Sequence, residues 1–206
     1  MKQRHSNNTL VVIQAAFPHS LADDVLEVMK VIPATDSEPH GDAAFKVYID
    51  SGELKIPYRV YFPEVYSWQH KDLTNTQKAI LAAIFTRHHS GYQREIWADK
   101  LTLHPSEWST PFIAALFGDY VEEILAVLES KLGDNWGSLI QELAVRNPKW
   151  RRPLNHQILN YWAIYYRQKT PFLTDYPGYK LAERFGLWDK KTAPRLIKNG
   201  KQRAML

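Results

Sequence analysis

Cysteine is absent from the 206-residue sequence. This absence excludes disulfide frameworks, zinc sites with cysteine ligands and catalysis by a thiol. The sequence also contains none of the motifs G-x-x-x-x-G-K-[ST], G-x-G-x-x-G, G-x-S-x-G and H-E-x-x-H. The common nucleotide-binding and hydrolase signatures are therefore missing, and an enzyme without a short motif is the third functional alternative.

Long apolar runs are missing too, since no segment approaches the roughly 18 apolar residues of a membrane-spanning helix. The N-terminus has a basic start and an apolar run at 9–16, which is short even for a signal peptide. Val11, Val12 and Ile13 are β-branched, so this run predicts a buried strand. We expect a protein without membrane contact, and the lack of cysteine fits a cytoplasmic location.

The composition provides enough apolar material for a folded core. Hydrophobic residues make up 45% of the chain and aromatic residues 13%, which argues against global disorder. The length predicts one domain or one domain with an appendage. We divide the chain into a small α/β element at 1–70, a helical body at 71–188 and a basic tail at 189–206.

Residues 73–132 contain the longest strong helical pattern. Thr74 or Thr76 can cap a first helix, whose apolar residues recur at spacings of three and four and which ends near Gly91. A second helix is expected at 92–101. Thr110 and Pro111 open a third, which Gly118 and Asp119 kink or divide.

The remaining segments predict short elements around this helical stretch. The expected elements are a helix after Ser20, a β-hairpin formed by 44–50 and 54–62 around Gly52, helices at 136–145 and 154–167, and a helix at 179–185 that Gly186 ends. Trp188 is expected to pack back onto the body. The predicted fold class is α+β and mainly α, with an antiparallel body of about six helices and a small N-terminal strand, helix and β-hairpin.

Two segments of the helical stretch carry a resemblance to known proteins. Residues 92–101 (YQREIWADKL), followed by a helix with residues 117–124 (FGDYVEEI), resemble the helix pairs of HEAT-type repeats. They also resemble helical bacterial families of uncharacterised function. The resemblance implies a bacterial helical protein with a binding surface and implies no catalytic residue.

Charge differs sharply between the two parts of the chain. Residues 1–145 contain 12 Lys/Arg and 19 Asp/Glu, a net charge of −7, whereas residues 146–206 contain 14 and 3, a net charge of +11. Such asymmetry indicates a polyanion or an acidic partner, or it complements the acidic helices of the same molecule. The residues for nucleic-acid binding would be Arg146, Lys149, Trp150, Arg151, Arg152, Lys190, Lys191, Arg195 and Lys198.

A second candidate surface surrounds the turn between the first two helices of the body. Two arginines one loop apart can bind a carboxylate or phosphate with their forked guanidinium groups. Alternatively, one of them pairs with Glu95 or Asp99, or closes the end of a helix. The candidate binding residues are Arg87, His88, His89, Tyr92 and Arg94.

Metal and acid–base sites have weaker support. His88 and His89 are adjacent, so on a helix their side chains point about 100° apart and rarely bind one ion. Asp119 with Glu122 or Glu123 could form a pair of acid–base carboxylates, but Glu122 and Glu123 are expected on a helix whose other face is core. A solvated face is therefore the expectation for these carboxylates. We therefore expect neither a metal nor a cofactor.

Together these observations favour a non-enzymatic helical protein that binds a protein partner. Nucleic-acid binding through the basic C-terminal third is the alternative. The sequence carries no signal for a particular oligomeric state.

Overall fold

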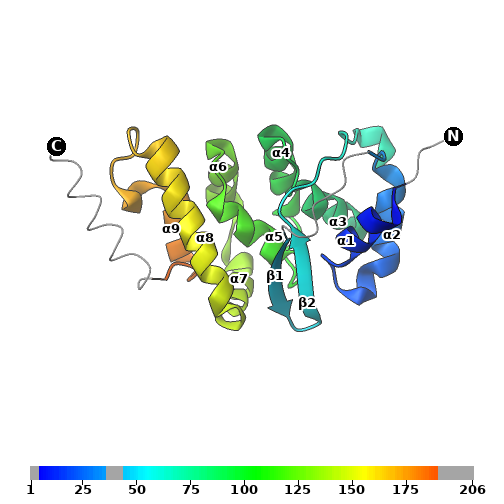
Figure 1. The fold of residues 1–206 in the computed structure, drawn as a ribbon, viewed down its shortest axis with the longest axis horizontal. Helices are drawn as coiled ribbons and strands as arrows, with labels where there is room; N and C mark the ends of the chain where they lie inside the picture. The colour runs from blue at the N-terminus through cyan, green and yellow to red at the C-terminus, as the bar shows by residue number, and fades with distance from the viewer. Residues whose placement is uncertain (1–4, 36–43, 190–206) are drawn as a thin grey trace.

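The computed structural model describes residues 5–35 and 44–189, and this part confirms a mainly helical α+β fold. It contains a two-stranded antiparallel sheet and nine α-helices, arranged as in Figure 1. The elements are α1 (Asn7–Gln14), α2 (Ala22–Val31), β1 (Ala44–Ile49), β2 (Gly52–Pro57), α3 (Asn75–Phe85), α4 (Gly91–Leu101), α5 (Thr110–Ala115), α6 (Glu122–Lys131), α7 (Asp134–Arg146), α8 (Pro148–Tyr161) and α9 (Pro177–Arg184).

Local signals place several of these boundaries as predicted. Thr74 caps α3 in a capping box, because its hydroxyl accepts from Gln77 N–H while the Gln77 side chain accepts from Thr74 N–H. Gly186 has a φ of +73°, and Leu187 N–H donates to the Ala182 carbonyl at 2.8 Å, so the chain leaves α9 there. The predicted third helix is divided near Gly118 into α5, a 3-10 turn and α6.

The prediction of a strand at 9–16 is wrong, because α1 occupies this segment. The Ser6 hydroxyl accepts from Thr9 N–H at 3.0 Å and caps the helix. Thr9 and Ile13, four residues apart, are buried, whereas Val11 is 63% exposed. A short apolar run fits a strand or a helix equally well, and the cap decides between them.

The helix expected at 154–167 also differs from the structure. The observed helix α8 begins at Pro148, six residues before the predicted start at 154. Proline is tolerated there because the N–H groups of the first helical turn have no partner within the helix. The last part of the predicted helix is a π-helical turn at Trp162–Tyr166. Trp188 packs back onto the body as predicted, with its ring 4.7 Å from that of Tyr179.

The β-hairpin lies in the middle of the molecule, with α1 and α2 towards one end of the long axis and α8 and α9 towards the other (Figure 1). Its pairing runs from Ala44 opposite Pro57 to Ile49 opposite Gly52. Both edges are fastened to helical segments. The Asn147 side chain accepts from Tyr48 N–H at 2.7 Å and donates to the Tyr48 carbonyl at 2.8 Å, while Lys55 N–H donates to the Ala15 carbonyl at 2.7 Å.

One cluster of buried apolar side chains runs through the described residues from Ile13 to Trp188. It includes residues from both sides of position 70, and the predicted division into two elements there stays a prediction. The predicted tail at 189–206 lies outside the described residues except for Asp189. In the part of the chain that is described, every helix is too short or too polar to cross a membrane.

Two glycines give a matched test of the packing. A Cβ added at Gly178 would lie 2.7 Å from the Phe117 carbonyl oxygen, whereas one added at Gly137 has its nearest neighbour, Phe185 Cε1, at 4.0 Å. We expect Gly178→Ala to lower the free energy of unfolding by about 1–3 kcal/mol, because the backbone must move. Gly137→Ala, inside α7, should raise it by about 0.5–1 kcal/mol. Urea unfolding measures both, and equal effects would contradict the packing of α9.

Candidate functional site

The segment that follows β2 lies against the end of α3 and brings distant arginines together. Val60 N–H donates to the Arg87 carbonyl at 2.8 Å, and His89 N–H donates to the Val60 carbonyl at 3.0 Å. This short parallel bridge places Arg59 in the same region as Arg87, although the two are separated by 28 positions. Arg94 enters from α4. We call Arg59, Arg87, Arg94 and Asp119 the arginine cluster.

Arg94 and Asp119 form a buried, bidentate ion pair. Arg94 Nε and Nη2 donate to the two carboxylate oxygens of Asp119 at 2.8 and 2.9 Å, and both side chains are almost inaccessible. Arg94 Nη1 donates to the carbonyls of His88 and His89 at 3.0 and 2.9 Å. Burial alone lowers the pKa of Arg94, but the hydrogen bonds that Arg94 donates to Asp119 and the attraction of that carboxylate outweigh burial and raise the pKa above its ordinary value.

Arg87 is buried without a carboxylate at ion-pair distance among the described residues. Its Nε donates to the Pro57 carbonyl at 3.3 Å and its Nη2 to the Tyr58 carbonyl at 2.9 Å. Its guanidinium carbon lies 5.5 Å from the centre of the Phe45 ring. Burial, reinforced by repulsion from Arg59, lowers the pKa of Arg87. This side chain fastens the segment after β2 to α3.

Arg59 is the member of the cluster that reaches the surface, with 14% of its side chain exposed. Its Nη2 lies 3.8 Å from Asp119 Oδ2, which is an ion-pair distance but too long for a hydrogen bond. Its guanidinium carbon lies 4.7 Å from the centre of the Tyr58 ring. Burial and then repulsion from Arg94 lower the pKa of Arg59.

The two histidines occupy different environments. His88 is buried, its Nδ1 accepts from Ser90 N–H at 3.1 Å, and its Nε2 donates to the Phe62 carbonyl at 2.8 Å. Burial lowers the pKa of His88, which matches a neutral ring with both nitrogens already engaged. His89 is exposed and stacks on Tyr61 at 5.1 Å. Among the described residues, no group of three or more His, Asp or Glu could hold a metal ion.

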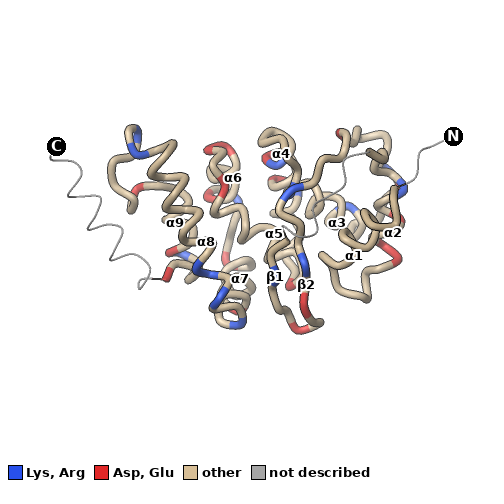
Figure 2. The backbone as a smooth tube through the Cα atoms, in the orientation of Figure 1, with Lys and Arg blue, Asp and Glu red and all other residues tan. Residues whose placement is uncertain are grey.

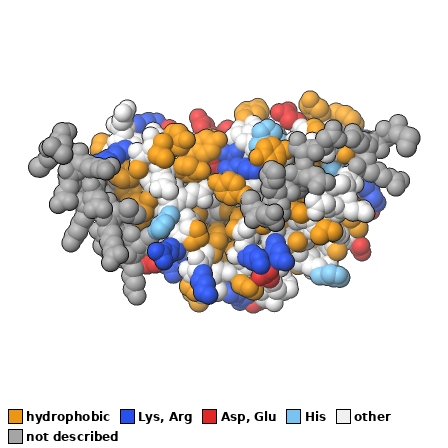
Figure 3. Space-filling view, in the orientation of Figure 1, with side chains coloured by type: hydrophobic (Ala, Val, Ile, Leu, Met, Phe, Trp, Pro, Cys, Tyr) orange, Lys and Arg blue, Asp and Glu red, His pale blue; other side chains and the backbone are white. Residues whose placement is uncertain are grey.

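Four tyrosines from three separate segments form a partly exposed surface next to Arg59, which we call the tyrosine face: Tyr58, Tyr120, Tyr161 and Tyr165. The ring centres of Tyr120, Tyr161 and Tyr165 lie 5.4–5.9 Å apart. The hydroxyls of Tyr58 and Tyr161 are 3.4 Å apart. Figure 3 shows hydrophobic and aromatic side chains gathered over the region of α6 and α8, close to basic side chains near the centre of the molecule.

The π-helical turn after α8 contributes to this face. Tyr165 lies within it and is 60% exposed, and Tyr161 precedes it directly. A π-helical turn inserts an extra residue into the helical ladder and is frequent at functional sites. Tyr166 in the same turn donates its hydroxyl hydrogen bond to the Tyr120 carbonyl and so joins the turn to the start of α6.

The predicted binding residues are brought together only in part. Arg87 and Arg94 belong to the arginine cluster, and the His88 carbonyl accepts from Arg94. All three residues are buried, whereas Tyr92 is 66% exposed in the first turn of α4. The expectation that an arginine pairs with Glu95 or Asp99 is wrong for Arg94, whose partner is Asp119.

Arg59 and Asp119 were not predicted as members of the site. Asp119 was expected on a solvated face and is buried instead; Glu122 and Glu123 are exposed as expected. The available signal for Asp119 was its position at the break after Gly118, between two apolar helical segments.

The described basic residues of the alternative site lie where α7 meets α8 (Figure 2). Arg146 forms ion pairs with Asp50 and Glu107, Arg151 donates to the Trp188 carbonyl, and Trp150 stacks on Phe45. These three side chains therefore have partners within the same molecule. Lys149 and Arg152 are exposed, while Lys190, Lys191, Arg195 and Lys198 lie outside the described residues.

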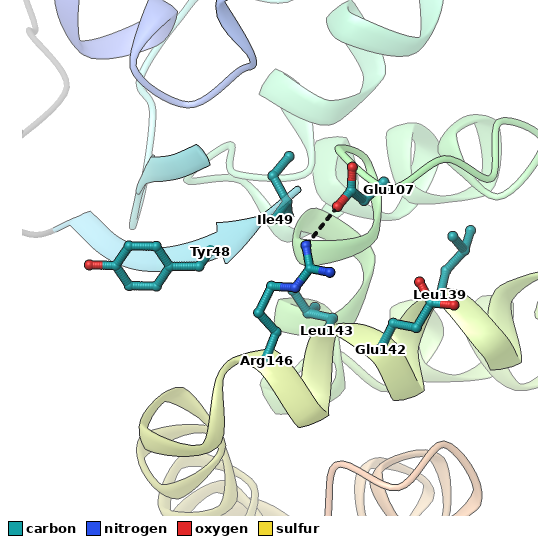
Figure 4. A pocket seen from close by; sticks show the side chains of 7 residues that line it. All are labelled: Tyr48, Ile49, Glu107, Leu139, Glu142, Leu143 and Arg146. Carbon is teal, nitrogen blue, oxygen red and sulfur yellow. Dashed lines mark hydrogen bonds and ion pairs between the residues drawn. The ribbon is translucent and has the colours of Figure 1, made fainter. Parts of the chain in front are cut away.

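A shallow pocket beside the hairpin offers little for binding. It is lined by Tyr48, Ile49, Glu107, Leu139, Glu142, Leu143 and Arg146. In Figure 4 the Arg146 side chain points towards Glu107, with which it forms a 3.1 Å ion pair, and Tyr48 points away from the other side chains. Arg146 is thus held by an internal partner, and the arginine cluster with the tyrosine face is the stronger candidate.

The buried pair can be tested with a matched exposed pair. We expect Asp119→Asn to lower the free energy of unfolding by about 3–5 kcal/mol, because it leaves the buried Arg94 guanidinium without a counter-charge. Asp99 pairs with Lys131 at 2.8 Å, but both side chains are more than 40% exposed. Asp99→Asn should therefore change stability by less than about 1 kcal/mol. Equal urea midpoints for the two variants would contradict this role of the pair.

The tyrosines around the site predict a loss of stability at high pH. Burial raises the pKa of Tyr161 and of Tyr166 to about 12 from an ordinary value of 10.0. Above pH 10 the unfolded chain therefore loses these protons before the folded protein does, and the stability present below pH 10 is lost as pH rises towards 12. Urea unfolding at increasing pH measures this. Tyr166→Phe should flatten the dependence and Tyr66→Phe, at an exposed position, should not.

Comparisons with known families, proteins and structures identified no relative from which a function could be inferred. No family model matches the sequence, and neither a curated protein nor a solved structure matches it significantly. The resemblance to HEAT-type helix pairs, and the bacterial origin that it implies, therefore stay predictions.

Proposed function

We propose that this chain is a non-enzymatic interaction protein, and that its tyrosine face binds a protein segment that carries an anionic group. The observation that supports this most directly is the gathering of Tyr58, Tyr120, Tyr161 and Tyr165 beside a partly accessible arginine. Tyrosine and arginine are the residue types that dominate the binding energy of protein interfaces, together with tryptophan.

The chemistry of the face suits such a partner. Tyrosine provides a large contact area at a low cost in side-chain entropy, together with a hydroxyl for hydrogen bonding. Tyr58, Tyr120 and Tyr165 are each more than a third exposed. The rings of Tyr120 and Tyr165 contact each other and Tyr161, and the Tyr58 hydroxyl contacts that of Tyr161. The guanidinium groups of Arg59 and Arg94 lie against these rings. Their positive charge favours an acidic segment over a neutral one, because opposite charges speed association and like charges oppose it.

Peptide selection tests this proposal. Random peptides of about twelve residues, displayed on phage, would be selected on the wild-type protein, because a segment of this length can span a groove or face. We expect enriched peptides to combine acidic with apolar residues. Tyr165→Ala should weaken their binding by about tenfold, as removal of an interface hot spot does.

Tyr48→Ala is the matched control, because Tyr48 is also exposed but lies on the hairpin. Its binding should equal that of the wild type in a fluorescence titration. Peptides without acidic residues, or peptides that bind the Tyr165→Ala variant as well as the wild type, would overturn the proposal.

Nucleic-acid binding is the second candidate, favoured by Lys149 and Arg152. Both are exposed at the start of α8, and neither forms an ion pair with a described residue. If they contact phosphates, the double variant Lys149→Ala/Arg152→Ala should reduce the slope of log affinity against log salt by about two units on duplex DNA. No binding of single- or double-stranded DNA or RNA by the wild type at low salt would exclude this candidate.

A further inference from the structure

The arginine cluster carries more positive charge than its own carboxylate balances. Arg59, Arg87 and Arg94 contribute three guanidinium cations, and Asp119 contributes one carboxylate. Among the described residues, no other carboxylate lies at ion-pair distance from these arginines. A guanidinium stays protonated at neutral pH even when burial lowers its pKa. Counted over the described residues, the cluster therefore has an excess of two positive charges.

We propose that the tyrosine face receives a phosphate monoester on the partner protein, and that Arg59 contacts the phosphate. This inference rests on the proposed function, because the phosphate would belong to the docked segment. A phosphate monoester carries a charge of about −1.5 to −2 at pH 7 and has three acceptor oxygens. A carboxylate carries one negative charge and leaves half of the excess unbalanced. A phosphate dianion balances it.

Of the three arginines, Arg59 combines an exposed part with N–H donors that have no partner in the part of the chain that the structure describes. Its Nη1 donates to the Tyr58 carbonyl at 2.9 Å, and its 3.8 Å separation from Asp119 is too long to occupy a donor. A guanidinium has five N–H donors in a planar fork that matches phosphate oxygens. Arg87 and Arg94 are buried and act on the phosphate through their field.

Tyrosine hydroxyls are available at the same place. The Tyr58 and Tyr161 hydroxyls form a long hydrogen bond at 3.4 Å, so one of them donates to the other and one hydroxyl proton remains for a ligand. The Arg59 guanidinium lies over the Tyr58 ring. The Tyr161 hydroxyl is protonated near pH 7.5, as an ordinary tyrosine is, and burial raises its pKa further, to about 12. A neutral hydroxyl can donate to a phosphate oxygen. The site thus offers charge and directional donors next to aromatic rings.

Small aromatic anions separate phosphate recognition from general anion binding. Phenyl phosphate, phenyl sulfate and benzoate share an aromatic ring and differ in the charge and geometry of the anionic group. We would measure their affinities by calorimetry at low salt and near pH 7.5, where the phosphate ester is mostly a dianion. We expect phenyl phosphate to bind about tenfold more tightly than phenyl sulfate or benzoate, because it alone supplies the second charge.

Variants connect this preference to the cluster. Arg59→Gln should abolish the preference for phenyl phosphate, whereas Arg59→Lys, which keeps the charge but loses the planar fork, should retain part of it. Lys149→Gln is the matched control for a basic residue outside the face and should bind like the wild type. Arg59 is partly exposed and has a long ion pair, so its variants are expected to fold, and a thermal melt verifies this.

A second arm uses the titration of the probe itself. Near pH 5 phenyl phosphate becomes a monoanion, since the second pKa of a phosphate ester is about 6, and its advantage over phenyl sulfate should disappear. His88 and His89 also lie in this region, because Arg94 donates to both of their carbonyls. They act on both probes, so the ratio of the two affinities removes their effect.

The outcomes distinguish this inference from the proposed function. Equal affinities for phenyl phosphate and phenyl sulfate, or a preference that persists in Arg59→Gln, would overturn phosphate recognition. Acidic peptides selected on the tyrosine face would then still support the proposed function. If none of the three probes binds, phosphate recognition is overturned, and the peptide selection decides the proposed function separately.

Discussion

The buried pair of Arg94 and Asp119 joins three parts of the structure that the chain visits separately. Arg94 lies on α4 and Asp119 directly before α6. The Arg94 guanidinium also donates to the carbonyls of His88 and His89, which follow α3. Removing either partner would leave a buried charge or several carbonyls without a counterpart, which costs far more than a surface pair. The positions of the other arginines depend on this junction.

The cluster is held together by dipoles as well as by charge. Arg87 is surrounded by carbonyl oxygens and aromatic rings, and Arg59 by a carbonyl and a tyrosine ring. Carbonyl oxygens and π faces carry partial negative charge, so they make buried guanidinium groups tolerable without neutralising them. Over the described residues, the fold therefore keeps more positive than negative charge next to the tyrosine face.

The sequence predicted what local chemistry controls. The cap at Thr74 and the stop at Gly186 depend on a few neighbouring residues, and both were correct. The pairing of Arg94 with Asp119 was not predictable in this way, because 25 positions separate the two residues and closer carboxylates were available. Arg59 was missed for the same reason, since the bridge at Val60 exists only once the chain has folded. The segment 9–16 was wrongly assigned as a strand because it is a short apolar run, and the spacing of apolar residues in such a run does not distinguish a strand from a helix.

The side chain of Asn147 has a consequence for the behaviour of the protein at high concentration. An isolated two-stranded hairpin exposes unpaired N–H and C=O groups along both edges, and such edges recruit strands from other molecules. The amide of Asn147 occupies the N–H and C=O of Tyr48 as a neighbouring strand would, and the Ala15 carbonyl occupies Lys55 N–H on the other edge. An amide side chain thus takes the place of a third strand and protects the hairpin against edge-to-edge aggregation.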